Sequence, residues 1–294
     1  MRSEEEQRAL RLARRTENDE LRLQAGWPAR VALRVPESDK AFFGLPYLFA
    51  SAFPAVADEP LRRLALACKL LRDAELLRAM RAAPDAPPAS AALRVAAQQL
   101  EANALFAGLF GGDARFWDAL RGAERRFAHA LAEEELYRAG RRAVAELDDA
   151  GALALAAAKT VSIPVALAGL AVLAGDDGAR APLARSVERY CEARQLLADL
   201  RAWKADLACG RATWVLARLA RTAPEAYAAR DVTGLTRALF AAGIARDALA
   251  RAIASCEQSA GAVRGVAGTA RWTAFAGIAA RRAAALLGEM RGAA

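Results

Sequence analysis

The chain has 294 residues, 55% of them hydrophobic and 26% charged, so it can bury a core and is too apolar to be disordered throughout. Its formal net charge of +8 is compatible with an acidic partner such as a phosphorylated small molecule. The arginines that dominate this charge are dispersed rather than gathered in one run, which argues against a nucleic-acid-binding protein. The four cysteines form no C-x-x-C pair, so they predict neither a zinc site nor a disulfide framework.

The N-terminal residues 1–26 are strongly charged and are predicted to form an exposed helical arm in front of one domain over residues 27–294. This segment has no apolar core of a secretory signal, so we expect a cytoplasmic protein. From Trp27 to Pro60 prolines punctuate the sequence, and residues 83–90 form a predicted loop with three prolines.

Alanine, leucine and arginine are abundant and aromatic residues are only 6%, so the composition favours helix over strand. No interval repeats at the period of a helical solenoid, which favours a single bundle. We predict an all-α fold of about ten helices, formed by the arm and by residues 60–80, 91–110, 115–135, 139–146, 152–174, 182–208, 213–221, 232–258 and 262–290.

The most apolar stretch runs from Gly151 to Gly175 and is long enough to cross a bilayer. It contains Lys159 and Pro164 and is about half alanine. We interpret it as a buried central helix, with a membrane span as the alternative, and predict no transmembrane segment.

One helix carries polar residues that an apolar bundle would not otherwise need. At about 100° per residue, Gln195, Asp199, Ala202 and Asp206 lie in one narrow stripe. Gly210 provides a predicted helix stop, and the next residue, an arginine, lies near the negative end of the helix dipole.

The pattern Q-L-x-x-D-L-R-x-W-x-x-D-L-x-x-G-R, which runs from Gln195 to Arg211, resembles the class I isoprenoid-synthase superfamily. The similarity is particularly to its squalene and phytoene synthase branch and to bacterial terpene-synthase-like proteins. The resemblance implies a helical bundle around a central cavity, in which two acidic helices bind magnesium and thereby an allylic diphosphate. An upstream apolar segment with Lys159, and a helix that ends in the acidic run Glu133–Glu135, agree with it.

The resemblance also implies roles for individual residues. It makes Asp199 and Asp206 catalytic, and it makes Asp73, Asp199 and Asp206 the magnesium ligands. It assigns diphosphate binding to Lys69, Lys159, Arg194 and Arg211, and a pocket to Gln195, Ala202 and Trp203.

Both acidic motifs are depleted in this chain. Alanine stands at positions 198, 202 and 205, where the family pattern calls for acids, and the first motif is reduced to Asp73 and Glu75. Because magnesium prefers carboxylate and phosphate oxygens, we expect the remaining acids to hold one ion at most. The individual residues also have simple structural alternatives. These are an ion pair with a neighbouring-helix arginine for Asp199, a solvated helix end for Asp206, an i, i+4 pair with Lys69 for Asp73, a snorkelling side chain for Lys159, and a surface or packed position for His129.

Three functional classes follow. The first is a magnesium-dependent terpene cyclase or prenyltransferase that acts on a prenyl diphosphate, or on a polyene derived from it, with a reduced set of metal ligands. The second is a metal-independent cyclase on a neutral substrate, and the third is a non-catalytic partner subunit that retains the fold. The first class is the leading hypothesis. A homo-oligomer and a hetero-oligomer both remain open.

Overall fold

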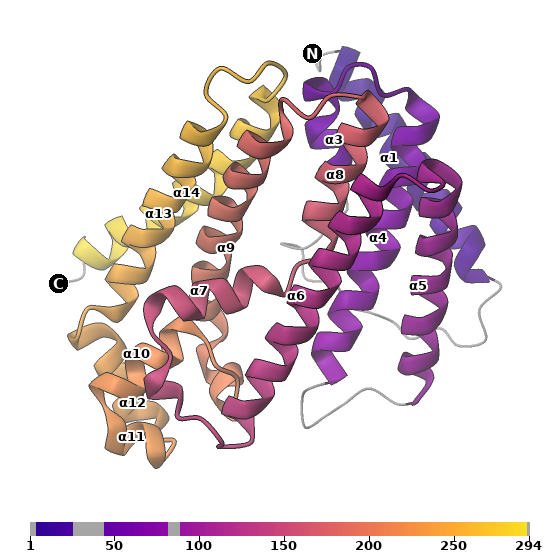
Figure 1. The fold of residues 1–294 in the computed structure, drawn as a ribbon. Coiled ribbons are helices and arrows are strands. Elements are labelled where there is room, and N and C mark those ends of the chain that lie inside the picture. Colours follow the sequence, from indigo (N-terminus) through magenta and orange to yellow (C-terminus); the bar gives the residue numbers. More distant parts are fainter. Residues whose placement is uncertain (1–3, 26–43, 82–88, 293–294) are drawn as a thin grey trace. The chain divides into compact units, whose positions relative to one another are not determined.

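The computed structural model describes residues 4–25, 44–81 and 89–292 (Figure 1). Within these ranges it contains thirteen α-helices, two short 3₁₀ helices and no β-strand, which confirms the all-α prediction. The chain divides into two compact units. The first comprises Met1–Arg125, Thr160–Ala184 and Gly265–Trp272, and the second comprises Arg126–Lys159, Arg185–Arg264 and Thr273–Ala294. The predicted boundary after residue 26, and most of the predicted loop at 83–90, lie outside the described residues, so that boundary stays a prediction.

The first unit is built around α4 (Asp58–Arg81), which packs against α1 (Glu4–Ala25), α5 (Ala89–Phe110) and α8 (Ser162–Ala174). Helix α4 buries residues on several of its faces, including Leu61, Leu64, Leu70, Leu71 and Leu77, and therefore packs against neighbours on several sides. The short helices α3 (Leu45–Phe49) and η1 (Ala50–Ala52) close one end of this group.

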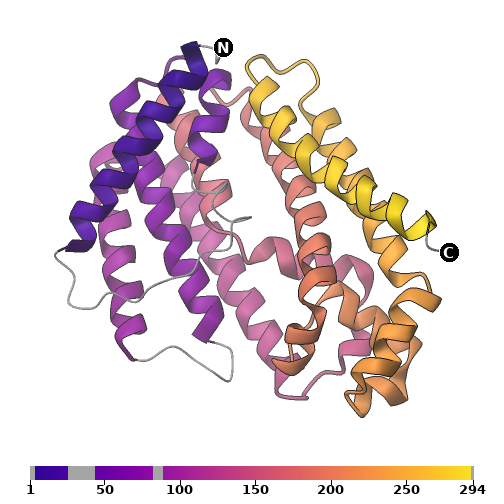
Figure 2. The ribbon, with the colours of Figure 1, turned by 180° about the vertical axis from the view of Figure 1, so that it is seen from behind.

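The N-terminal helix α1 is part of the first unit. It lies along α4, as Figure 2 shows from behind, and its Ala9 and Leu12 are buried. The expectation of an exposed arm is therefore wrong for this helix. The buried residues of α1, which are Ala9, Leu12, Thr16 and Glu20, recur at helical spacing on the side that packs against α4, while most of its other charged residues stay exposed.

The second unit contains η2 (Val144–Glu146), α7 (Asp149–Ala158) and the helices from α10 onward: α10 (Trp214–Thr222), α11 (Pro224–Ala228), α12 (Val232–Ala241) and α13 (Ile244–Ala262). Helix α10 packs against all of the others in this group. The buried hydroxyl of Ser186 lies 2.6 Å from the carbonyl oxygen of Ser259 and donates to it, which ties α9 (Arg180–Ala208) to α13. Helices α6 (Ala114–Arg138), α9 and α14 (Ala270–Gly292) contribute residues to both units.

The predicted central helix over 152–174 is two helices, α7 and α8, which are separated at residues 159–161. Pro164 lies in the first turn of α8, where a missing N–H leaves no hydrogen bond unmade. Among the described residues no single helix is long and apolar enough to cross a membrane, and only the interrupted pair α7 and α8 passes that test on length and composition.

Other helix boundaries also differ from the prediction. The helix expected over 232–258 is broken at Gly243, which adopts a left-handed φ of 72°, and resumes as α13. Residues 139–143 form turns after α6 instead of a helix, because Gly140 with φ 68° ends that helix. The two short helices α3 and α11 were not predicted; each has a proline in its first turn.

Candidate functional site

Asp199 on α9 is the most deeply buried of the predicted site residues in the second unit, with 2% of its surface exposed. Its Oδ1 accepts a hydrogen bond from Gln195 Nε2 at 2.6 Å, one helical turn away. Its Oδ2 accepts from the backbone N–H of Trp214, the first residue of α10, at 3.2 Å. The carboxylate therefore joins α9 to the positive end of α10, rather than pairing with an arginine of a neighbouring helix.

Burial disfavours the charged carboxylate and raises the pKa of Asp199 to about 7. The hydrogen bond from Gln195 opposes this rise, and the nearby charge of Asp206 adds to it. Asp199 therefore changes protonation near neutral pH.

Asp206 lies at the C-terminal end of α9 and is buried. The predicted helix stop is confirmed: Gly210 has φ 64°, and the backbone N–H of Arg211 donates to the carbonyl oxygen of Asp206 at 2.9 Å. The Arg211 side chain then donates from Nη1 to Asp206 Oδ1 at 3.2 Å. Burial raises the pKa of Asp206, and the positive charge of Arg211 works against that rise. The alternative of a solvated helix-end charge is wrong.

Lys159, at the C-cap of α7, forms an ion pair with Glu134 of α6, with Nζ 2.6 Å from Oε1. The positive charge of Lys159 also lowers the pKa of both Asp199 and Asp206. These five side chains form what we call the α9 carboxylate cluster: Glu134, Lys159, Asp199, Asp206 and Arg211. Glu134 was not predicted, and its only signal in the sequence is the acidic run at the end of α6.

The remaining predicted residues of the second unit differ in environment. Gln195, Ala202 and Arg194 are half-buried on α9, and burial lowers the pKa of Arg194 to about 10. Trp203 is buried in the hydrophobic core of this unit, and the ammonium of Lys204 lies 5.6 Å from its ring centre. The pocket assignment of Gln195, Ala202 and Trp203 stays a prediction.

In the first unit, Lys69 lies between two carboxylates. Its Nζ is 2.7 Å from Glu20 Oε1 and 3.5 Å from Asp73 Oδ2. Gln98 of α5 also donates to Asp73 Oδ2, at 3.5 Å. The i, i+4 pair of Lys69 with Asp73 was predicted and is confirmed, whereas the contributions of Glu20 and Gln98 were not. Burial raises the pKa of Asp73 to about 6, against the opposing charge of Lys69.

Glu75, two residues further on, closes the start of α8. Its Oε1 accepts from the backbone N–H of Ser162 at 2.6 Å and of Val161 at 3.0 Å. Arg72 Nη1 donates to its other oxygen at 2.9 Å. Burial raises the pKa of Glu75, and Arg72 opposes the rise. This carboxylate therefore has a structural role at a helix N-terminus.

The predicted magnesium ligands can be tested against these contacts. Among the described residues no three His, Cys, Asp or Glu side chains are grouped so that they could hold a metal ion. Both oxygens of Asp199 accept hydrogen bonds, whereas within the described part of the chain Asp206 Oδ2 accepts none. The residues do not fit a multi-ion cluster. They fit one ion that takes its other ligands from phosphate and water, as magnesium often does. The juxtaposition of Asp73 with Asp199 across a cavity stays a prediction.

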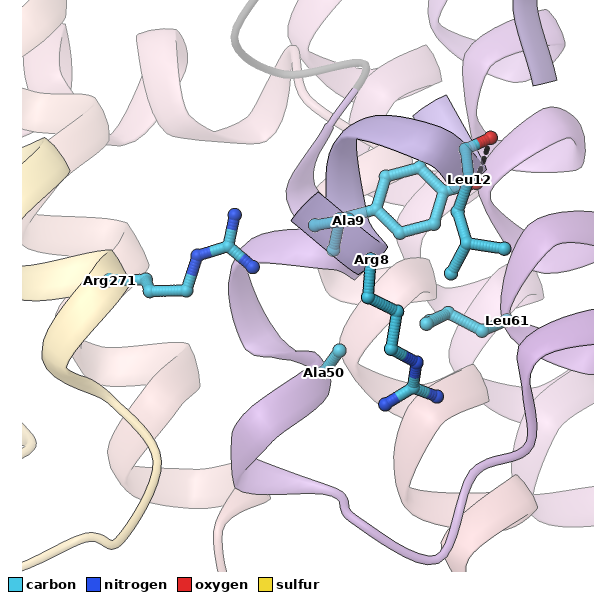
Figure 3. Close-up of a pocket in the computed structure, with 7 residues that line it drawn as sticks. Arg8, Ala9, Leu12, Ala50, Leu61 and Arg271 are labelled. Atoms are coloured by element: carbon cyan, nitrogen blue, oxygen red, sulfur yellow. Dashed lines mark hydrogen bonds between the residues drawn. The ribbon is translucent and has the colours of Figure 1, made fainter. Parts of the chain in front are cut away.

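A small pocket in the first unit is lined by Arg8, Leu12, Tyr47, Leu61 and Arg271, with Ala9 and Ala50, and contains none of the predicted site residues (Figure 3). Arg8 Nε donates to Asp58 at 2.6 Å. The Tyr47 hydroxyl lies 2.5 Å from that of Thr16, and burial raises the pKa of Tyr47 to about 12. Arg8 and Tyr47 of this pocket therefore already bind other residues of the protein, and we assign the pocket no role.

Comparison with known proteins finds similar structures but no similar sequence. No family model and no curated protein sequence matches the chain. Its structure is similar to that of polyprenyl synthase ISP_B from Roseobacter denitrificans, with a TM-score of 0.70 and 17% identity over 94% of this chain and 99% of that one. It is also similar to a polyprenyl synthase from Caulobacter crescentus CB15, complexed with calcium and isoprenyl diphosphate, with a TM-score of 0.61 and 20% identity over 92% and 97% of the two chains.

These likenesses show that the chain has the all-helical fold of polyprenyl synthases, which is the fold that the motif predicted. The more specific resemblance to the squalene and phytoene synthase branch stays a prediction.

Proposed function

We propose that the protein binds a prenyl diphosphate and acts on it as a prenyltransferase or terpene cyclase with a reduced set of metal ligands. The observation that carries this proposal is the α9 carboxylate cluster, in which one oxygen of Asp206 accepts no hydrogen bond from the described residues and lies near the charges of Lys159 and Arg211. Its support from outside the chain is the shared fold with a polyprenyl synthase complexed with calcium and isoprenyl diphosphate.

The charges of the cluster determine which ligand it can accept. Its three carboxylates and two cations give a net charge of −1 when all are ionised, so a diphosphate alone is repelled. A divalent cation at Asp206 reverses that sign, and the cluster then attracts a diphosphate. Magnesium, when bound, would neutralise part of the negative charge that develops on the leaving diphosphate.

The chain's own residues then bind and orient the substrate. Lys159 and Arg211 are both paired with carboxylates, and a diphosphate oxygen can replace Glu134 at Lys159 or Asp206 at Arg211 as the hydrogen-bond acceptor. Asp199 positions the start of α10 through its bond to the Trp214 N–H. Departure of the diphosphate leaves an allylic cation, and the positive side chains stabilise the charge that develops on the leaving group.

A second candidate, the non-catalytic subunit, is favoured by one specific observation. Both oxygens of Asp199 accept hydrogen bonds that join α9 to α10, so this acid already has a structural role. A subunit of this kind would bind the prenyl diphosphate without converting it.

The test combines the purified chain with geranyl, farnesyl or geranylgeranyl diphosphate, in the presence of magnesium or of a chelator. Calorimetry measures binding, and product analysis after incubation measures conversion. We expect binding that needs magnesium and is weakened at least tenfold by Asp206→Asn or Lys159→Gln. Lys204→Gln, an exposed lysine of the same helix, is the matched control and should bind as the parent does.

Product formation that stops with the chelator selects the enzyme, and magnesium-dependent binding without product selects the non-catalytic subunit. No binding of any of the three diphosphates, with or without magnesium, would reject both. Conversion of a neutral polyene without metal would instead support the metal-independent cyclase.

A further inference from the structure

The corner between α12 and α13 exposes an aromatic side chain. Phe240, in the last turn of α12, is 56% exposed, and of the described Phe, Tyr and Trp side chains it alone is exposed. Ala241 and Ala242, which follow it, are exposed as well. Figure 1 shows α12 beside α10 and α11 at one end of the second unit. A single exposed apolar residue needs no explanation by itself, so its surroundings decide whether it has a role.

The backbone holds this corner in a fixed shape. Gly243 makes the turn with a left-handed φ of 72°, and its N–H donates to the carbonyl oxygen of Phe240 at 3.0 Å. Leu239 before the corner and Ile244 after it are buried in the hydrophobic core of the second unit. Because both neighbours are fixed in the core, residues 240–242 project outward as a preformed apolar tip, which we call the α12–α13 tip.

An exposed arginine stands on each side of the tip. Arg237 lies about one helical turn before it and Arg246 lies at the start of α13, and neither forms an ion pair within the described part of the chain. The Arg246 guanidinium lies over the turn, with Nη2 2.8 Å from the position that a Cβ on Gly243 would take. Asp247, the nearest acid in sequence, accepts a hydrogen bond from Arg218 of α10 at 3.1 Å. The tip therefore combines an apolar end with two cations that have no carboxylate partner.

We propose that the α12–α13 tip attaches the protein to an anionic lipid surface, with Phe240 inserted among the lipids and Arg237 and Arg246 bound to headgroup phosphates. Aromatic side chains beside basic ones are typical of segments that lie on membranes, and guanidinium groups bind phosphate oxygens well. The formal net charge of +8 favours approach to an anionic surface.

The size of the tip favours lipid over a protein partner. A specific protein interface buries about 800 Å² on each partner, and one phenylalanine with two alanines offers far less apolar surface than such an interface uses. Insertion into a lipid surface needs no complementary shape, and the arginine stems can extend along the apolar boundary while their charges stay in water. One inserted side chain gives weak and reversible attachment. This inference does not depend on the proposed ligand.

The test is flotation of the full-length chain with lipid vesicles. We expect the parent to bind vesicles that contain phosphatidylglycerol but not vesicles of phosphatidylcholine alone, and sodium chloride should release it because salt screens the attraction. Phe240→Ser should lower the ratio of bound to free protein by about fivefold, since the inserted aromatic surface is lost. Arg237→Gln combined with Arg246→Gln should abolish the preference for phosphatidylglycerol.

Matched control variants lie on α14. Ile278→Ser replaces an apolar side chain that is 42% exposed, and Arg281→Gln combined with Arg282→Gln removes two exposed arginines. Both controls should bind the vesicles as the parent does, and circular dichroism should show that every variant remains helical. Phe240→Trp measures insertion directly: brominated lipid chains should quench the fluorescence that this residue adds, whereas they should not quench the fluorescence that Ile278→Trp adds.

Four outcomes would overturn the proposal. The first is a parent that floats with neither kind of vesicle, or a tip variant that floats as the parent does. The second is an equal loss of binding in the α14 controls, which would indicate general attraction of a basic chain. The third is release by sodium phosphate beyond that by sodium chloride at equal ionic strength, which would indicate a site for free phosphate. The fourth is an oligomer without lipid that Phe240→Ser converts to a monomer in sedimentation, which would make the tip a contact between copies.

Discussion

At the scale of single residues, the buried acids of this chain serve two purposes. Asp199 and Glu75 each accept backbone N–H groups at the start of a following helix, and Asp73 and Asp206 each pair with a cation of their own helix or its end. A buried carboxylate is tolerated only when such partners offset its desolvation. The acids that a family-type metal site would use are therefore also part of what holds each unit together.

The protonation of Asp199 should make stability depend on pH. Its pKa is raised from 3.8 in the unfolded chain to about 7 in the folded state. The folded state therefore binds more protons between these values, and the unfolding free energy falls as the pH rises through this window. Asn at this position resembles the protonated acid and does not ionise. Between pH 5 and pH 8 we expect the unfolding free energy of Asp199→Asn to fall less than that of the parent. The difference should be about 2–3 kcal/mol, because each pKa unit corresponds to about 1.4 kcal/mol.

Denaturant unfolding of both proteins at the two pH values measures this difference. Asp118→Asn is the control, because Asp118 is an exposed acid of α6 and should leave the pH dependence as it is in the parent. Part of the fall with pH should persist in Asp199→Asn, since Asp73 has a pKa of about 6 and contributes in the same direction. If Asp199→Asn and the parent lose the same unfolding free energy between the two pH values, folding does not raise the pKa of Asp199.

The residue-scale contacts show what a sequence can predict. The pairing of Lys69 with Asp73 and the helix stop at Gly210 are local features of the chain, and each was predicted. The common stripe of Gln195 and Asp199 was also predicted, whereas the hydrogen bond between them was not. The contacts of Asp199 with Trp214 and of Lys159 with Glu134 join different helices. They depend on tertiary packing, for which local spacing contains no signal.

At the scale of elements, most helices were predicted and their breaks were not. Alanine-rich sequence favours helix so uniformly that 152–174 and 232–258 each read as one helix. The breaks are set by backbone conformation and by capping: Gly243 takes a left-handed φ, and Glu75, distant in sequence, accepts the first N–H groups of α8. A single glycine in an alanine-rich window does not by itself distinguish a break from an interior position.

Two glycine-to-alanine substitutions should therefore have opposite effects. Gly243→Ala forces a side chain into the left-handed region at φ 72° and should destabilise the protein by about 1 kcal/mol. Gly288→Ala lies inside α14 with no atom near the added Cβ, and should stabilise it by about 0.5–1 kcal/mol. Thermal melts compare the two variants with the parent. A stabilising Gly243→Ala would mean that α12 and α13 form one continuous helix after all.

At the scale of the whole molecule, the short motif on α9 and the helix-favouring composition together predicted the fold. The pattern from Gln195 to Arg211 implied an isoprenoid-synthase-like helical chain, and the polyprenyl synthases with this fold match more than nine-tenths of the chain at 17% and 20% identity. The pattern of buried leucines and alanines that builds each unit can be kept while the acids of the site are lost, because packing and metal binding place separate demands on a helix. Fold and function are for this reason tested by different experiments.

Acids placed at the alanine positions of α9 test whether this helix faces a diphosphate site. Ala198 and Ala202 are half-buried on α9, one helical turn apart, and Ala202 lies in the same stripe as Asp199 and Asp206. Aspartate at both positions changes the net charge of the α9 carboxylate cluster from −1 to −3, so the double variant Ala198→Asp, Ala202→Asp should have a lower melting temperature without magnesium. Magnesium with geranylgeranyl diphosphate should raise that temperature by more than it does in the parent, because a ligand that binds only the folded state stabilises it.

Ala250→Asp, on the exposed side of α13, is the control for an added acid, and the ligands should raise its melting temperature by no more than they do in the parent. If the double variant also gains no more than the parent, α9 does not face a diphosphate site, and the roles proposed for Asp199 and Asp206 in binding should be abandoned.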